Sequence, residues 1–203
     1  MGPEKLPGNL PGVLIEGESS KSIFSINIDQ VLGAKMAVDY LIDLGHKKIA
    51  HISGPLGWYE SEKRILGWKQ SLQEAKLKAN IMEQGDWTPR SGYIATKRII
   101  DLHPEVTAIF CSNDAMALGA LKALFENKIL VPSKMSVVGF DDIPEASYFQ
   151  PALTTVVQDF ELVGNASLEM LVNLIDGKEM KIKGEAIKPA LIVRDSYGRV
   201  SRK

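Results

Sequence analysis

The feature that most constrains this chain is a regular alternation of short apolar runs with longer amphipathic segments. In "FSINI" the apolar side chains of Phe24, Ile26 and Ile28 fall at every second position, which is typical of a strand. Helix signals separate such runs: Thr88 before Pro89 predicts a helix start, and Gly45 predicts a helix end. Strands that alternate with helices predict an α/β fold with doubly wound parallel sheets and helices on both faces.

The expected segments follow from this alternation. We expect strands near 12–17, 24–29, 47–53, 81–85, 107–113, 135–141, 153–158 and 186–194, and helices near 30–44, 61–75, 89–102, 114–127 and 161–176.

Composition narrows the class of protein. The chain has 203 residues, of which 45% are hydrophobic and 24% charged, as in soluble globular proteins. Its apolar runs are too short to cross a bilayer, and its N-terminus lacks a secretion signal, so we expect a cytoplasmic protein with no membrane contact. A net charge of −1 does not favour a chain that binds nucleic acid by itself. The single cysteine, Cys111, lies in an apolar stretch, which indicates burial.

Polar residues gather where the predicted strands lead into helices. In an open α/β sheet, small molecules bind outside the carboxyl ends of the strands, so these junctions are the place to expect a ligand. We expect Asp29, Asn113 and Asp141 to converge on one rim, whereas Asp114 and Asp142 are expected only to cap helices. The residues at these junctions are Asp29, Gly54, Pro55, Asp86, Trp87, Asn113, Asp114, Asp141 and Asp142.

Aromatic residues near the same junctions can cover the apolar face of a sugar ring, while acids and amides grip its hydroxyls. Trp87 lies in a predicted loop beside Gly85 and is the favoured candidate, whereas Trp68 has the spacing of a core residue. The aromatic candidates for the ligand face are Trp58, Tyr59, Trp87 and Phe160.

Catalytic signatures are missing from the sequence. It has no G-x-S-x-G, P-loop, G-x-G-x-x-G or H-E-x-x-H, so we predict no catalytic residue, no metal and no cofactor. The histidines, His46, His51 and His103, have no partner at the spacing of a triad or a metal site. One enzymatic alternative stays open: a glycosidase with Asp29 and Asp141 as its two carboxylates.

Seven motifs follow one another along the sequence: "NIDQVLGAKMAVDYLIDLGHKKIAHISGP", "R-x-x-GW", "GDW-x-x-x-SGY", "SNDAMALGALKAL", "VPSKMSVVGFDD", "QPALTTVVQDFELVG" and "LIVRDS". Together they resemble the effector-binding core of the lactose repressor family of bacterial transcription regulators. The resemblance runs from about Val13 to Ser196.

The resemblance implies a two-lobed, periplasmic-binding-protein-like core that binds a sugar such as a galactoside in its cleft. Binding would shift the affinity of an attached helix-turn-helix for operator DNA. Trp58 and Glu60 occupy cleft positions that vary within the family. The effector-contacting positions that the resemblance implies are Asp29, Arg64, Trp87, Asn113, Asp141 and Phe160.

The resemblance also predicts a domain organisation. Residues 1–12 are expected to form a connector, 13–45 and 159–183 part of the N-terminal lobe, and 46–158 with 184–203 the C-terminal lobe. No helix-turn-helix precedes them in this sequence, so we expect an N-terminally truncated chain with an incomplete N-terminal lobe that reaches operator DNA only through the absent domain. The helix near 30–44 would then expose apolar surface.

Two further expectations concern assembly and the alternative function. Family members usually dimerise, and the helix 114–127 with "ASYFQP" is expected at that contact. The same fold also serves as the sugar-binding component of transport systems, which stays the alternative to a regulator.

Overall fold

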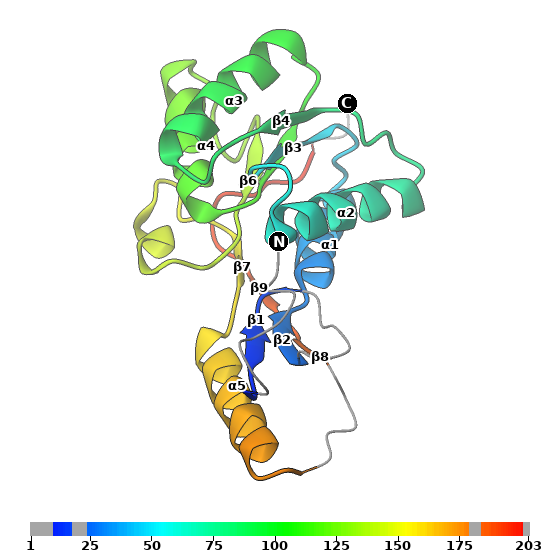
Figure 1. Cartoon of the computed structure of the whole chain (residues 1–203). Coiled ribbons are helices and arrows are strands. Elements are labelled where there is room, and N and C mark those ends of the chain that lie inside the picture. The colour runs from blue at the N-terminus through cyan, green and yellow to red at the C-terminus, as the bar shows by residue number, and fades with distance from the viewer. Residues whose placement is uncertain (1–9, 18–23, 179–183, 201–203) are drawn as a thin grey trace. The chain divides into compact units, whose positions relative to one another are not determined.

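The computed structural model describes residues 10–17, 24–178 and 184–200 of the chain (Figure 1). Most of the predicted connector, residues 1–9, lies outside the described residues. The chain divides into two compact units: unit 1 comprises 1–29 and 158–189, and unit 2 comprises 30–157 and 190–203.

Unit 2 contains a four-stranded parallel sheet in the order β4-β3-β5-β6. After β3 the chain runs through α2 to β4 at the edge and then through α3 back across to β5. The direction of winding therefore reverses between β3 and β5, which makes the space beyond their carboxyl ends a topological switch point. The elements of unit 2 are α1 (Gln30–Asp43), β3 (Ile49–Ser53), α2 (Tyr59–Glu74), β4 (Met82–Gln84), α3 (Pro89–Leu102), β5 (Ala108–Cys111), α4 (Asp114–Glu126), β6 (Ser136–Val138), η1 (Pro144–Tyr148), β7 (Thr155–Val157) and β9 (Ala190–Ile192).

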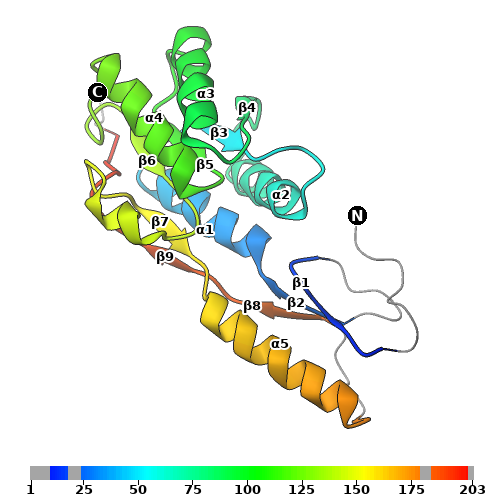
Figure 2. The same cartoon turned by 60° about the vertical axis from the view of Figure 1, so that its left-hand side comes forward.

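Both faces of this sheet are buried, as a doubly wound fold requires. Along β5 the side chains alternate: Ala108 and Phe110 pack in the core with α1 and α2, and Ile109 and Cys111 pack in the core with α3 and α4. Figure 2 shows α1 and α2 on one side of the strands and α3 and α4 on the other. The predicted fold class is confirmed.

Helices α3 and α4 cross at close range through two glycines. A Cβ on Gly92 would come within 2.1 Å of the Met116 carbonyl oxygen, and a Cβ on Gly119 within 1.8 Å of the Pro89 carbonyl oxygen. No larger residue fits at either position without moving the backbone. This contact fixes α4, the helix that begins at the edge of the candidate site described below.

A single strand over 186–194 was expected, and this prediction is wrong. The segment forms two strands, β8 (Gly184–Ile187) in unit 1 and β9 in unit 2. Pro189 lies between them and has no N–H to continue a hydrogen-bonded ladder. Strand β9 pairs antiparallel with β7, with Val156 opposite Leu191.

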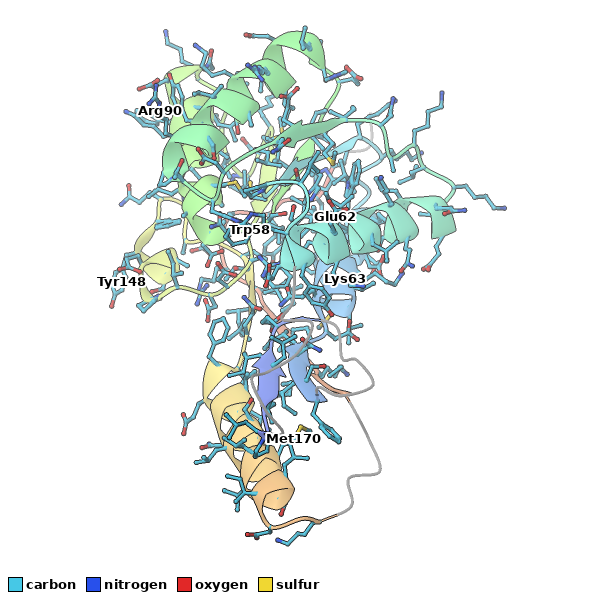
Figure 3. The ribbon with its side chains drawn as sticks, viewed as in Figure 1. Trp58, Glu62, Lys63, Arg90, Tyr148 and Met170 are labelled. Atoms are coloured by element: carbon cyan, nitrogen blue, oxygen red, sulfur yellow. The ribbon has the colours of Figure 1, made fainter. Side chains whose placement is uncertain are left out.

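Unit 1 consists of a three-stranded parallel sheet in the order β1-β2-β8 with one helix. Its core contains Ile26 and Ile28 from β2, Val163 and Met170 from α5, and Ile187 from β8. Met170 projects from α5 in Figure 3. The elements of unit 1 are β1 (Val13–Ile15), β2 (Phe24–Ile28), α5 (Phe160–Ile175) and β8.

The boundary between the units differs from the predicted one at α1, which belongs to unit 2. Its apolar face, which includes Ala34 and Leu41, is fully buried against Trp68 and Leu72 of α2 and the sheet. The prediction that this helix exposes apolar surface is therefore wrong, because α2 covers its apolar face. No helix within residues 10–17, 24–178 and 184–200 is long and apolar enough to cross a membrane.

Candidate functional site

A pocket of about 280 Å³ lies in unit 2 beyond the carboxyl ends of β3 and β5, at the topological switch point. It combines two indole rings with one guanidinium, one amide and two carboxylates. Its lining residues are Trp58, Glu60, Arg64, Trp87, Asn113 and Asp141.

Arg64 is held rigidly although it carries a charge. Its side chain is almost fully buried, its Nε donates to Gln30 Oε1 at 2.8 Å, and its Nη1 donates to the Ser112 carbonyl oxygen. The guanidinium carbon lies 3.8 Å from the centre of the Phe140 ring, as in a cation–π contact. Nη1 also lies 3.4 Å from Asp141 Oδ1, so Arg64 and Asp141 form an ion pair in the pocket.

Trp87 depends on a glycine for its place. A Cβ on Gly54 would lie 2.2 Å from the Cη2 and Cζ2 atoms of the Trp87 ring, so the indole covers Gly54 directly. Trp87 itself has a φ of 71°, the left-handed region. Its ring meets that of Trp58 edge to face, with the centroids 6.2 Å apart. Its Nε1 is buried and has no hydrogen-bond partner among the described residues.

Asn113 joins the pocket to α4. Its Oδ1 accepts from the Met116 backbone N–H at 2.8 Å, and its Nδ2 donates to the Trp87 carbonyl oxygen at 3.1 Å. Asn113 is thus the N-cap of α4 and also fixes the loop that carries Trp87. The prediction that Asp114 caps this helix is wrong, because Asp114 is the first helical residue.

Asp141 and Asp142 follow β6 and both have left-handed backbone; this pair is called the Asp141–Asp142 turn. Their φ angles are 117° and 54°, a conformation that non-glycine residues seldom adopt. The turn directs the Asp142 carboxylate away from the pocket to Arg194, with Oδ1 and Nη2 2.7 Å apart. Asp142 therefore forms an ion pair and does not cap a helix, contrary to the prediction.

Burial changes the protonation of the groups beneath the pocket. Burial raises the pKa of Asp114 to about 7, although hydrogen bonds from Thr155 and Ile143 oppose the rise. Burial lowers the pKa of His51 to about 3, so this ring, stacked between Trp68 and Phe110, is neutral. His51 contacts Ser112 and the Phe110 carbonyl oxygen, which makes it a structural residue.

Of the eight predicted site residues, six line this one pocket. Asp29 and Phe160 belong to unit 1. The Asp29 backbone N–H donates to the Ile187 carbonyl oxygen, and Phe160 begins α5 with 58% of its surface exposed. Tyr59 does not line the pocket, although it is the first residue of α2.

Sequence reasoning missed the residues that hold Arg64: Gln30, Ser112 and Phe140. Phe140 carried a signal, because it directly precedes Asp141 in the segment 135–141 that was predicted to be a strand leading to the site. Gln30 and Ser112 carried none, since they lie 34 and 48 residues from Arg64 along the chain. Within the described ranges 10–17, 24–178 and 184–200, no group of three or more His, Cys, Asp or Glu residues can hold a metal ion.

Curated relatives are transcriptional repressors. The lactose operon repressor of Escherichia coli K12 is 33% identical over 186 residues, which cover 92% of this chain and 51% of that protein. The HTH-type transcriptional repressor PurR of Klebsiella pneumoniae is 35% identical over 192 residues, which cover 93% of this chain and 56% of that protein. The chain thus spans about half the length of these relatives. They favour a regulator over the transport alternative.

Solved structures and a family model agree with these relatives. A Lac repressor dimer bound to operator and the anti-inducer ONPF matches with a TM-score of 0.88 and 32% identity, over 94% of this chain and 66% of that one. A complex of the transcriptional regulator CelR with cellobiose matches with a TM-score of 0.85 and 31% identity, over 91% of this chain and 58% of that one. The family model of the periplasmic binding protein-like domain matches residues 38–197. The chain therefore belongs to the LacI family and comprises its periplasmic-binding-protein-like domain.

Proposed function

We propose that the pocket lined by Trp58, Glu60, Arg64, Trp87, Asn113 and Asp141 binds a sugar effector. The observation that carries this proposal is the pairing of indole rings with an ion pair and an amide in one pocket of about 280 Å³. Sugars have apolar ring faces and neighbouring hydroxyls, so a site for them needs aromatic faces beside paired donors and acceptors.

Each type of side chain has a distinct part in this site. The Asp141 carboxylate accepts hydrogen bonds from sugar hydroxyls, and the Arg64 guanidinium donates to their oxygens. Because Arg64 is fixed by Gln30, Ser112 and Phe140, little side-chain entropy is lost when it binds a ligand. The Trp87 ring supplies an apolar face, and its unpartnered Nε1 is a donor that a ligand or a bound water can satisfy.

A galactoside or a similar glycoside is the preferred effector. The sequence resemblance favours it, and two similar solved structures contain sugars: the CelR complex with cellobiose and a Lac repressor bound to ONPG. A purine is the main competitor, since PurR is among the similar repressors.

The resemblance assigns Asp29 and Phe160 to the same effector. Both residues belong to unit 1, and their contribution is tested by substitution. Asp29→Asn and Phe160→Ala are each expected to weaken sugar binding without abolishing the fold of unit 2. Wild-type affinity in both variants would remove them from the site.

In the intact regulator, effector binding would change the affinity for operator DNA and would occur in the cytoplasm. This coupling is reciprocal, so DNA that binds one form must change the sugar affinity by the same factor. The chain acts as a sensor and carries out no chemistry in this proposal. Sustained turnover of a chromogenic galactoside by the pure protein would contradict that statement.

Dimerisation is proposed through α4 and the segment after β6. Phe125 on α4 is 78% exposed and Tyr148 in η1 is 85% exposed, and Figure 3 shows Tyr148 projecting away from the ribbon. Such exposure of large apolar rings marks an interaction surface. Phe125 lines a groove of about 500 Å³ together with Leu130 and with Gln150, which lies two residues after Tyr148. A Phe125→Ser, Tyr148→Ser variant should sediment as a monomer at concentrations where the wild type is dimeric.

A thermal-melt screen tests the sugar proposal directly. A ligand that binds only the folded state at a hundredfold excess over Kd stabilises it by about 2.7 kcal/mol. For a chain of this size that raises Tm by roughly 5–10 °C. The panel comprises methyl β-galactoside, methyl β-glucoside, cellobiose and a purine base.

The screen includes two kinds of variant. Asp141→Asn and Trp87→Ala should lose the shift, whereas Asp195→Asn, an exposed acid of unit 2, should keep it. A shift with the purine alone would overturn the sugar assignment. Equal shifts in all variants would place the ligand outside this pocket.

A further inference from the structure

Asp114 lies beside the candidate pocket but does not line it. It directly follows the pocket residue Asn113 and is fully buried. Its Oδ1 accepts from the Thr155 hydroxyl at 2.6 Å, and its Oδ2 accepts from the Ile143 backbone N–H at 3.0 Å. Asp114 lies in the first turn of α4, where the helix dipole favours a negative charge, and both hydrogen-bond partners of its carboxylate lie outside that helix.

Asp114 bonds to the residues on both sides of the Asp141–Asp142 turn, once through its backbone and once through its side chain. Before the turn, the Phe140 carbonyl oxygen accepts from the Asp114 backbone N–H at 2.8 Å. After the turn, Ile143 donates its N–H to the Asp114 carboxylate. The carboxylate also lies close to the backbone at Gly139, where an added Cβ would come within 2.2 Å of Oδ1. Asp114 thus contacts the chain on both sides of the turn, through its backbone N–H at Phe140 and through its carboxylate at Ile143.

The turn needs such support because its backbone is unfavourable. Asp141 and Asp142 both have positive φ angles, and a conformation of this kind persists only where the surrounding structure imposes it. The turn separates two neighbouring acids: Asp141 faces Arg64 in the pocket, and Asp142 faces Arg194. The Asp141 backbone is also held by β7, because its N–H donates to the Val156 carbonyl oxygen at 2.8 Å.

We propose that Asp114 is a positioning residue for the effector: its buried carboxylate holds the left-handed turn that presents Asp141 to the pocket, and thereby sets effector affinity. The proposal about the turn stands on the contacts above, and its link to affinity rests on the proposed sugar-binding function. The residue itself touches no ligand.

The charge of Asp114 is the variable that an experiment can change. Among the described residues, the charged or titratable groups that act on it are Asp141 and Asp142 at the end of β6, and the buried Cys111 thiol of β5 lies within its electrostatic reach. The two acids are each paired with an arginine. Burial raises the pKa of Asp114 to about 7, so the ionised form that accepts both hydrogen bonds most strongly is lost as the pH falls through neutrality. Sugar affinity should fall over the same range.

A first measurement needs no ligand. In ¹H–¹⁵N spectra recorded between about pH 5.5 and 8.5, the Ile143 and Asp141 amide signals should titrate together with a midpoint near 7. Thr155→Val removes a hydrogen bond that lowers the pKa of Asp114, so it should move this midpoint to higher pH. Asp114→Asn should abolish the titration. An Asp141 signal that ignores pH while Ile143 titrates would refute the positioning role.

A second measurement connects the turn to the effector. Affinities for methyl β-galactoside, methyl β-glucoside and cellobiose are measured by calorimetry over the same pH range. Asp114→Asn should weaken binding of the active sugar about tenfold at pH 8, the size of one hydrogen bond to a charged group, and should remove the pH dependence. Asp101→Asn, an exposed acid on α3, is the matched control and should keep both.

The outcomes separate the two proposals. If the amide signals titrate together as expected but no sugar binds, the sugar-binding proposal fails and the role of Asp114 in the turn stands. If a sugar binds the wild type with the same affinity at all pH values and binds Asp114→Asn equally well, the link to affinity is refuted. Should Asp114→Asn fail to fold, the midpoint shift in Thr155→Val decides the question.

Discussion

Replacing Gly54 by Ala should displace the Trp87 ring from the pocket and lower the stability of the fold only slightly. The added methyl group would lie 2.2 Å from two atoms of the Trp87 ring and 2.7 Å from a third. Gly54 has no positive φ that would make alanine unfavourable by itself. The only demand of the substitution is therefore that the indole moves off its present position.

The two consequences should differ in size. Overpacking of this kind lowers the free energy of unfolding by about 1–3 kcal/mol, which corresponds to a Tm decrease of roughly 2–12 °C. The low end is expected, because Trp87 lies half-buried in a loop and its ring can swing outward. Loss of an anchoring tryptophan from a binding site costs about 2 kcal/mol or more, which weakens sugar binding about 30-fold.

The assay combines urea unfolding with calorimetric titration of the sugar found in the thermal screen. Gly164→Ala is the control, because an added Cβ at this position in α5 meets nothing within 4 Å. That change should stabilise the helix by about 0.5–1 kcal/mol and leave sugar affinity unchanged. Wild-type affinity in Gly54→Ala would refute the reading that the Trp87 ring forms the sugar-binding face.

Three further substitutions test the surrounding structure. Arg64→Gln leaves two buried acceptors without their donor, so it should lower the free energy of unfolding by roughly 2–6 kcal/mol in urea melts and should also abolish sugar binding. Between about pH 4 and 7, folded Asp114 holds a proton that the unfolded chain releases, so this carboxyl makes stability fall as pH rises through that window. Asp114→Asn should remove that contribution, which is up to about 4 kcal/mol. The free energy of unfolding of both proteins is measured at pH 4 and at pH 8, and the difference between wild type and variant should change by that amount. Gly119→Ala should destabilise the protein by about 3 kcal/mol or more, seen as a lowered Tm, since its Cβ would lie 1.8 Å from the Pro89 backbone oxygen; a Tm equal to that of the wild type would contradict the close contact of α3 and α4.

Much of unit 2 follows from local patterns in the sequence. The alternation of strands and helices predicts the sheet, whose strands β3, β5 and β6 are buried on both faces. The same logic predicts that Asn113 and Asp141 meet at one edge, since parallel strands end together. It places Trp87 there as well, because the loop after β4 ends at that edge.

The missed features depend on contacts between distant residues. Asp114 was predicted to cap a helix from its position at a strand–helix junction. Its actual partners, Ile143 and Thr155, lie 29 and 41 residues away, so no local pattern indicates them. The single strand predicted near the C-terminus ignored the effect of Pro189 on a ladder. The burial of α1 depends on its packing against α2. The sequence of a helix does not show which neighbouring element will cover its apolar face.

Calorimetric titration of the sugar panel into the wild-type chain and the Asp141→Asn variant tests the central claim most directly. We expect the wild type to bind one sugar class saturably at one site per chain. Asp141→Asn should lose that binding, because residue 141 then carries no charge, while its thermal unfolding stays cooperative. No saturable binding by any sugar, or equal binding by both proteins, would contradict the claim that this pocket is the effector site.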